Sequence, residues 1–206
     1  LSLLIQRSFE MFPKPKLLKL VHIIEISSHR LAGLIKNSLD ANALESGELN
    51  LSLGIFDFRP SLQFLRDDYL DLANEKDIKL HFLFPSAEEY KLLVNKSATL
   101  QVLDKLISNA IKYSPAGRNV YIRISEQANF MRCEVQDEGP GLSDTDQAKL
   151  FGKFVRLTPQ PIGDEHTTGL GLFIVKKLVE AMNGKVWCES ELGKGSTFIV
   201  ELPLAN

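Results

Sequence analysis

The sequence predicts an α+β protein in which a helical hairpin precedes an α/β sandwich with a mixed sheet. Two observations lead to this prediction. Apolar residues recur at helical spacing near the start of the chain, and helix-like and strand-like segments then follow one another. A chain of 206 residues has room for a small and a medium-sized domain. We assign residues 1–46 to the hairpin, 47–54 to a linker and 55–206 to the sandwich.

The hairpin is predicted from two apolar segments separated by a proline-rich turn. Residues 1–12 form the first arm, and the Pro-Lys-Pro sequence at 13–15 interrupts it. The second arm runs over residues 17–45, where leucine and isoleucine at heptad spacing form one wide stripe, as in a helix of a bundle. His22 and His29 lie away from this stripe. We interpret them as solvated surface histidines, with a phosphate acceptor as the alternative.

The sandwich is predicted from alternating helix and strand patterns with recognisable ends. Ser143 begins a capping box, and Asn183-Gly184 is typical of a left-handed helix end. We expect helices on one face of a mixed sheet. In chain order the predicted elements are an alternating segment at 51–58, a helix from Pro60 to about Lys76, a strand at 78–84, a helix at about 96–113, strands near 120–125 and 130–137, a short helix after Ser143, a helix at about 171–182, and strands near 185–190 and 196–202.

Composition and charge exclude some classes of function. The formal net charge is −2, which argues against a nucleic-acid-binding protein, since such proteins usually show a basic face. No apolar run approaches the roughly 20 residues of a membrane-spanning helix, and no signal peptide is visible. The chain begins without Met inside an apolar pattern, so we expect a fragment of a longer protein. Cys133 and Cys188 have no CxxC spacing and fit core positions in a reducing cytoplasm.

One predicted helix carries polar residues in a row. Lys105, Asn109 and Lys112 are spaced by four and three, so they share the side opposite the apolar residues. An amide oxygen can ligate a hard cation, and lysines can meet phosphate charge. The alternative is an ordinary solvated helix face.

Three glycine-rich segments follow. DEGPGL at 137–142 comes after a strand, and Asp137 could accept a hydrogen bond from an exocyclic amine. TTGLGLFIV at 167–175 puts two glycines at a helix N-terminus, which favours phosphate. GKGST at 193–197 enters the last strand. It is not a Walker A loop, and Gly169-Leu-Gly171 lacks the third glycine of a dinucleotide fingerprint. With the polar helix, the set indicates a nucleotide site.

The order of these segments resembles sensor histidine kinases, within the superfamily shared with gyrase, MutL and heat-shock chaperone ATPases. SNAIKYSP resembles the family's N box, DEGPGL, TTGLGLFIV and GKGSTF its three glycine boxes, and LFGKFVRL its F box. The hairpin is similar to the family's dimerisation segment. The resemblance covers nearly the whole chain and implies the Bergerat fold, with ATP and Mg²⁺ as cofactors.

The resemblance also implies roles for individual residues. Asn109 would ligate Mg²⁺, and Asp137 would hold the adenine amine. Residues 143–168 would form a lid anchored by Phe151 and Phe154, for which core packing is the alternative. The residues implied to bind nucleotide are Asn109, Lys112, Tyr113, Asp137, Gly139, Gly141, Leu142, Lys153, Arg156, Thr168, Gly169, Leu170, Gly171 and Thr197.

Two departures from the family pattern bear on activity. Four residues before the metal-binding Asn, gyrase-like relatives have a catalytic Glu and histidine kinases often have a second Asn. In this chain the residue at that position is Lys105. The family's phosphoacceptor histidine would lie shortly before Leu1, so we assign no catalytic residue in this chain.

The function implied is the cytoplasmic kinase core of a two-component sensor. It would form a homodimer through the hairpin as a four-helix bundle and pass a phosphoryl group to an upstream histidine, then to a response-regulator receiver domain. A degenerate signalling scaffold with weak or no nucleotide binding is the main alternative, and an ATPase unrelated to signalling is the third.

Overall fold

The computed structural model describes residues 14–46, 51–83, 91–159 and 168–205. The chain divides into two compact units, Leu1–Asp40 and Ala41–Asn206. The predicted limits of the hairpin and the linker stay predictions.

The described part of the first unit is helical. Helix α2 (Lys14–Glu45) corresponds to the predicted second arm and continues into the second unit. It begins earlier than predicted because Pro15 lies in the first turn, where a helix loses no internal hydrogen bond to a missing N–H. The predicted first arm lies outside the described residues. The large apolar side chains of α2 that remain exposed are Leu18, Leu20, Val21, Ile23, Ile24, Leu31, Leu34, Ile35 and Leu39.

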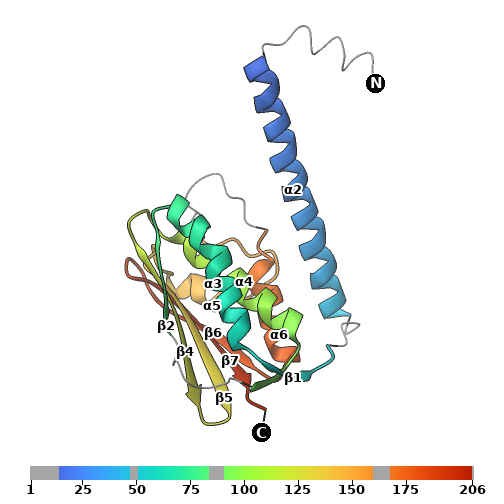
Figure 1. Cartoon of the computed structure of the whole chain (residues 1–206), viewed down its shortest axis with the longest axis vertical. Helices are drawn as coiled ribbons and strands as arrows, with labels where there is room; N and C mark the ends of the chain where they lie inside the picture. The colour runs from blue at the N-terminus through green and yellow to red at the C-terminus, as the bar shows by residue number, and fades with distance from the viewer. Residues whose placement is uncertain (1–13, 47–50, 84–90, 160–167, 206) are drawn as a thin grey trace. The chain divides into compact units, whose positions relative to one another are not determined.

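The second unit is built on a five-stranded mixed sheet, which confirms the predicted fold class (Figure 1). Strand β2 pairs parallel with β4, and every other pairing in this sheet is antiparallel. In spatial order the strands are β2 (Lys79–Leu83), β4 (Asn119–Gln127), β5 (Phe130–Asp137), β7 (Gly195–Pro203) and β6 (Lys185–Glu191).

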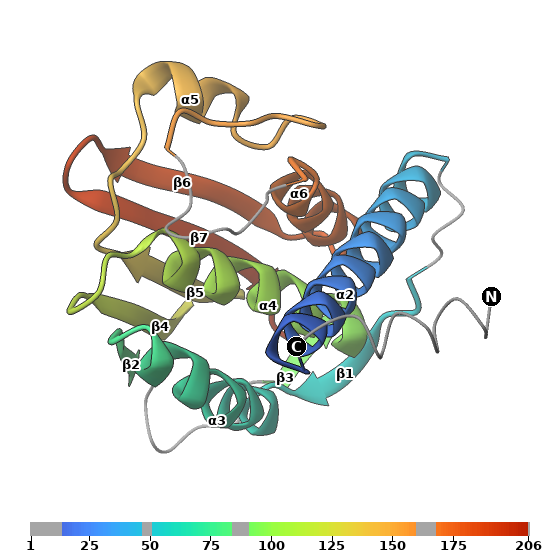
Figure 2. The ribbon, with the colours of Figure 1, turned by 90° about the horizontal axis from the view of Figure 1, so that it is seen from above.

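Three helices cover one face of this sheet. Figure 2 shows α3 (Arg59–Glu75), α4 (Lys96–Tyr113) and α6 (Gly171–Ala181) side by side. The Asn95 side chain caps α4 by accepting a hydrogen bond from the Ala98 backbone N–H at 3.0 Å. The predicted apolar side of α4 is buried in the core, so its polar row points away from the sheet.

Two short strands, β1 (Gly54–Asp57) and β3 (Lys91–Val94), form a separate antiparallel pair. The alternating segment at 51–58 pointed to the first strand, but the second was not predicted. Its four residues are too few to show an alternating pattern, and its pairing with a distant strand leaves no local signal.

The predicted helix ends are confirmed. Ser143 accepts a hydrogen bond from the Asp146 backbone N–H at 3.1 Å and caps α5 (Asp144–Lys149). Asn183 adopts a positive φ of 58° directly after the end of α6. This left-handed residue ends the helix and starts the turn into β6.

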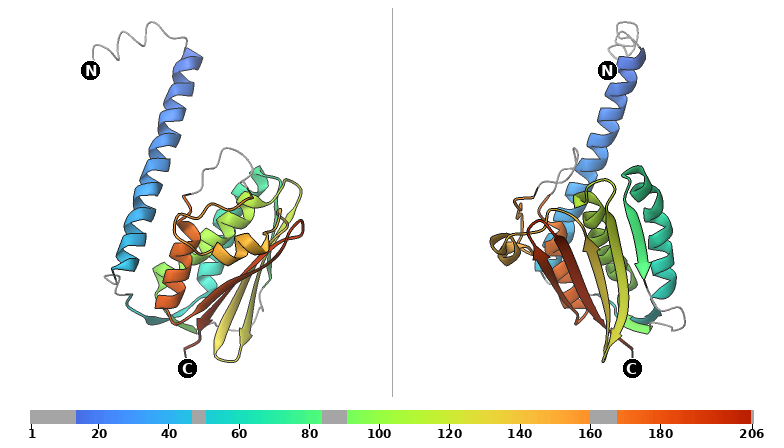
Figure 3. Two further views of the ribbon diagram at one scale, coloured as in Figure 1. Left: turned by 180° about the vertical axis from the view of Figure 1, so that it is seen from behind. Right: turned by 90° about the vertical axis from the view of Figure 1, so that its left-hand side faces the viewer.

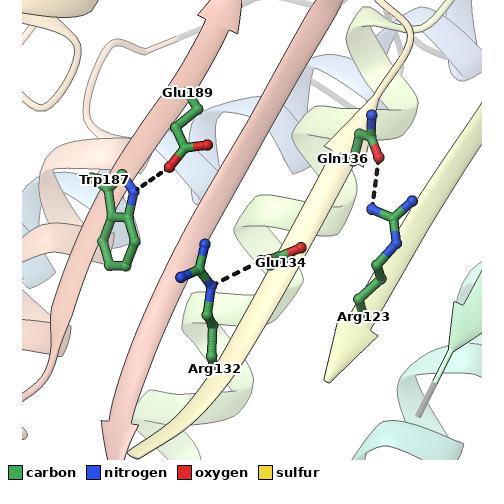
Figure 4. Close-up of polar contacts among 6 residues, drawn as sticks. All are labelled: Arg123, Arg132, Glu134, Gln136, Trp187 and Glu189. Carbon is green, nitrogen blue, oxygen red and sulfur yellow. Dashed lines mark hydrogen bonds and ion pairs between the residues drawn. The ribbon is translucent and has the colours of Figure 1, made fainter. Parts of the chain in front are cut away.

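The opposite face of the sheet carries polar and aromatic side chains. The right-hand view of Figure 3 looks onto the strands with α4 and α6 behind them. On this outer face the Arg132 guanidinium contacts the Glu134 carboxylate at 2.8 Å, and Arg123 donates to the Gln136 side chain at 2.6 Å (Figure 4). Polar side chains therefore satisfy one another on the face of the sheet opposite α3, α4 and α6. None of the described helices is long and apolar enough to cross a membrane.

Candidate nucleotide site

The polar row of α4 supplies the first group of candidate site residues. Lys105, Asn109, Lys112 and Tyr113 are all half-buried, at the side of the helix away from its apolar face. No described residue forms a hydrogen bond with the Asn109 amide. Its side-chain oxygen is therefore available as a ligand, and two ammonium groups lie within one helical turn of it in sequence.

Asp137 lies at the end of β5 and is only 4% exposed. Its Oδ1 accepts hydrogen bonds from the backbone N–H groups of Gly139 at 2.8 Å and Ser196 at 3.2 Å. Burial raises the pKa of this carboxyl to about 6, against the opposing effect of the two backbone donors. No described residue donates to Oδ2, so the carboxylate is fixed through one oxygen and can accept a hydrogen bond through the other.

The loop after Asp137 needs its glycines because neighbouring backbone lies very close. A Cβ at Gly139 would lie 2.8 Å from the Tyr113 carbonyl oxygen, and a Cβ at Gly141 would collide with the Glu191 carbonyl. Gly141 also has a positive φ of 68°. The loop is therefore held between the end of α4 and the end of β6, and it presents backbone next to the Asp137 carboxylate.

The second glycine segment leads into α6. The Thr168 hydroxyl accepts a hydrogen bond from the Leu170 N–H at 3.1 Å, and Gly171 begins the helix. A Cβ at Gly169 would lie 2.6 Å from the Val155 carbonyl oxygen, so this segment packs directly under the F-box backbone. The space beside Gly171 is open. The exposed N–H groups of this helix start can bind an anion.

The two predicted lid anchors differ. Phe151 is half-buried and packs against the core, whereas Phe154 is 63% exposed with a positive φ of 57°. The Lys153 ammonium lies 5.6 Å from the centre of the Phe154 ring, and Arg156 is exposed. Core packing thus describes Phe151, while Phe154 and Arg156 are exposed and Lys153 is half-buried. Residues 160–167 of the predicted lid lie outside the described part of the chain.

The buried Asp146 carboxylate links residues that precede the F box to a residue that follows it. Its carboxylate contacts the Lys149 ammonium at 3.2 Å and accepts from the Ser143 hydroxyl at 3.0 Å and the Thr158 N–H at 3.4 Å. Burial opposes the charge, but hydrogen bonds from Thr158, Ser143 and Lys149 outweigh it and hold the pKa of Asp146 below its ordinary value. One carboxylate therefore ties both ends of residues 146–158 together.

Thr197 does not lie where the sequence prediction put it. It pairs in register with Gln136, whose side chain lies on the outer face of the sheet, so Thr197 points away from Asp137. The residue on the Asp137 side is Ser196, which is 8% exposed. Strand alternation could have revealed this, because Ser196 shares its parity with the inward residues Phe198 and Val200.

The donor set around Asn109 fits one kind of metal ion. Within the described residues there is no group of three or more His, Cys, Asp or Glu side chains that could hold a metal. Magnesium bound to a nucleotide needs no such group, because waters and phosphate oxygens supply most of its ligands. A single amide oxygen, such as that of Asn109, suits that role.

Both cysteines fit the predicted structural role. Cys133 is fully buried and Cys188 half-buried, and both thiols are free. Burial raises the pKa of each thiol to about 12, so both stay protonated near neutral pH.

Comparison with known proteins agrees with this geometry. The model of the histidine kinase-, DNA gyrase B-, and HSP90-like ATPase family matches residues 95–206. Autoinducer 2 sensor kinase/phosphatase LuxQ of Vibrio vulnificus (strain YJ016) is 30% identical over 192 residues, which is 91% of this chain and 22% of LuxQ. Sensor histidine kinase WalK of Bacillus subtilis (strain 168) is 35% identical over 138 residues, 66% of this chain and 22% of WalK. The chain thus spans about a fifth of the length of these relatives.

Solved structures give the same result. Full-length ShkA in complex with AMPPNP superposes with a TM-score of 0.78 at 30% identity, covering 91% of this chain and 39% of ShkA. Histidine kinase ThkA in complex with response regulator protein TrrA has a TM-score of 0.72 at 22% identity, covering 99% of this chain and 56% of ThkA. At that identity the second match supports the fold alone.

Proposed function

The chain belongs to the histidine kinase-, DNA gyrase B-, and HSP90-like ATPase family, and we propose that it is the Mg-ATP-binding kinase core of a two-component sensor. The observation that carries this proposal is the Asp137 carboxylate. It is buried, held through Oδ1 by two backbone N–H groups, and has Oδ2 left to accept a hydrogen bond. This arrangement suits the 6-amino group of adenine.

The remaining residues bind and orient the triphosphate. The N–H groups at the start of α6 favour phosphate, and Lys112 neutralises charge from the α4 side. Asn109 would hold Mg²⁺ in part, and the bound ion would offset negative charge on the phosphates. In this proposal the chain contributes positioning and charge neutralisation, and the γ-phosphoryl group passes to a histidine upstream of Leu1.

We further propose the signalling context. The exposed apolar side chains among the described residues of α2 suit a homodimer that buries them in a four-helix bundle. A response-regulator receiver domain is the proposed acceptor of the phosphoryl group, since ThkA, a protein of the same fold, is found in complex with a response regulator. The cytoplasm is the proposed compartment, in keeping with two free thiols.

Calorimetric titration with a non-hydrolysable ATP analogue, with and without Mg²⁺, tests the nucleotide site. We expect Asp137→Asn to weaken binding about 10- to 100-fold, because a hydrogen bond to a charged group is lost. Glu134→Gln is the matched control, since it makes the same chemical change on the same strand but on the outer face. Equal effects of the two variants would argue against an adenine site at Asp137.

Lys105 favours a second candidate, a degenerate signalling scaffold. It lies on the same side of α4 as Asn109, one turn away, where an ammonium group competes with Mg²⁺ for phosphate charge. The same titration separates the two candidates. Mg²⁺-dependent binding by the wild type supports the kinase core, whereas binding that appears only in Lys105→Asn supports the scaffold.

A further inference from the structure

The Ser190 hydroxyl, near the end of β6, joins three segments of the candidate site. It accepts a hydrogen bond from the Leu142 backbone N–H at 2.8 Å and donates one to the Gly195 carbonyl oxygen at 2.8 Å. The Ser196 hydroxyl lies 2.9 Å away. A serine hydroxyl has one donor and two acceptor positions, so all three are used when Ser196 donates to it.

The three partners of the Ser190 hydroxyl come from two segments that contact Asp137, the glycine loop and the start of β7. Leu142 ends the glycine loop that begins at Asp137, and the Ser196 N–H donates to Asp137 Oδ1 at 3.2 Å. Gly195 packs so closely against the Asp137 carbonyl that a Cβ there would collide with it. Ser190 therefore holds the loop at its far end and also holds the strand segment that anchors the carboxylate.

Other hydrogen bonds between these segments involve only the backbone of Ser190 or do not involve Ser190 at all. The Gln147 amide donates to the Ser190 carbonyl at 3.0 Å and to the Leu142 carbonyl at 3.2 Å. The Gly193 N–H donates to the Pro140 carbonyl at 2.7 Å. These bonds remain when the hydroxyl is removed, so Ser190→Ala should keep the fold while the loop gains freedom around Asp137.

We propose that Ser190 is a positioning residue that fixes the Asp137 carboxylate for recognition of the 6-amino group of a purine nucleotide. This inference rests on the proposed function, because it assumes that adenine binds at Asp137. Ser190 acts through Leu142 and Ser196 rather than by touching the base. An acceptor that is already ordered loses little freedom on binding, so its hydrogen bond contributes more fully to affinity.

The test compares ATP with purine riboside triphosphate, which lacks the 6-amino group but has the same triphosphate. Affinities for both are measured calorimetrically with Mg²⁺ for the wild type, Ser190→Ala, Ser190→Thr and Ser190→Cys. Ser125→Ala is the matched control, because Ser125 pairs in register with Arg132 on the outer face of the sheet. The melting temperature of each variant is measured alongside.

We expect Ser190→Ala to weaken ATP binding about tenfold and purine riboside triphosphate binding by less than about threefold. The preference for ATP therefore falls. Ser190→Thr keeps the hydroxyl and should restore the preference. The thiol of Ser190→Cys forms only weak hydrogen bonds, so the preference of this variant for ATP should lie between those of the wild type and Ser190→Ala. This variant keeps the test valid if the alanine variant folds poorly. Ser125→Ala should match the wild type.

Equal losses for the two triphosphates in Ser190→Ala and Ser190→Cys would mean that Ser190 only supports the fold, and would overturn the inference. Unchanged affinities for both triphosphates in these variants would overturn it as well. If the wild type itself shows no preference for ATP, the adenine site at Asp137 is wrong, and the proposed function fails with the inference that rests on it.

Discussion

Nucleotide affinity should depend on pH through Asp137. Its pKa is raised from 3.8 to about 6 by burial, so the carboxyl is ionised above neutral pH and mostly protonated at pH 5. Only the ionised form offers an unprotonated Oδ2 to the adenine amine. With a pKa near 6, about one molecule in ten has the ionised form at pH 5. We therefore expect ATP to bind about tenfold more weakly at pH 5 than at pH 8.

The triphosphate also titrates in this range, so the assay needs a probe that shares that titration. Purine riboside triphosphate serves, because it lacks only the 6-amino group. Calorimetry at several pH values between 5 and 8 should show a steeper loss of affinity for ATP than for this analogue. Parallel pH profiles for the two nucleotides would refute the assigned role of Asp137.

The free energy of unfolding should also depend on the protonation of Asp137. Between about pH 4 and pH 6 the native state holds a proton that the unfolded chain has released, so the free energy of unfolding falls as pH rises. The stabilisation is fully present below about pH 4 and is lost above about pH 6. Its size is about 3 kcal/mol for a shift of about two pKa units. Denaturant titrations should show this slope in the wild type and not in Asp137→Asn.

Three further outcomes are expected. Gly141→Ala should lower the free energy of unfolding by at least about 2 kcal/mol in denaturant titration. The new Cβ would collide with the Glu191 carbonyl, and the residue has a positive φ. As a control, Gly54→Ala adds its Cβ in open space and should change the free energy of unfolding by less than about 1 kcal/mol. Thr197→Val should leave ATP affinity unchanged in calorimetry, and a loss above about threefold would return that residue to the site. Asp146→Asn should lower the free energy of unfolding at pH 7 in denaturant titration, because the contacts of the carboxylate with Lys149, Ser143 and Thr158 are weakened. Because the pKa of Asp146 is lowered, this deficit should shrink as pH falls through the range where the wild-type carboxyl becomes protonated.

Local sequence signals predicted most of the fold. The apolar spacing of α4 and α6, the cap at Ser143 and the left-handed residue Asn183 each depend on neighbours close in sequence. Strand β3 depends on pairing with β1 more than thirty residues away, so its four residues gave no pattern of their own. The same reasoning explains why local capping was predicted correctly and the short sheet was not.

Parts of the site were harder to predict because they depend on the direction in which individual side chains point. The glycine boxes located the loops, but the close packing of Gly139 and Gly141 against the Tyr113 and Glu191 carbonyls was not predicted. The motif GKGST alone did not say which of its two hydroxyls faces the site. Alternation with the buried residues Phe198 and Val200, together with the register with β5, puts Ser196 inward and Thr197 outward. Ser190 belongs to no motif, and its role becomes visible only through its contacts with Leu142 and Gly195.

A crystal structure of this chain with a non-hydrolysable ATP analogue and Mg²⁺ would show whether adenine binds at Asp137. We expect the 6-amino nitrogen of adenine to lie within hydrogen-bonding distance of Asp137 Oδ2, about 2.7 to 3.2 Å. We also expect the triphosphate at the start of α6, with the Asn109 amide oxygen toward the metal. An adenine ring bound elsewhere, or one whose amino group faces away from Asp137, would rule out the proposed nucleotide site.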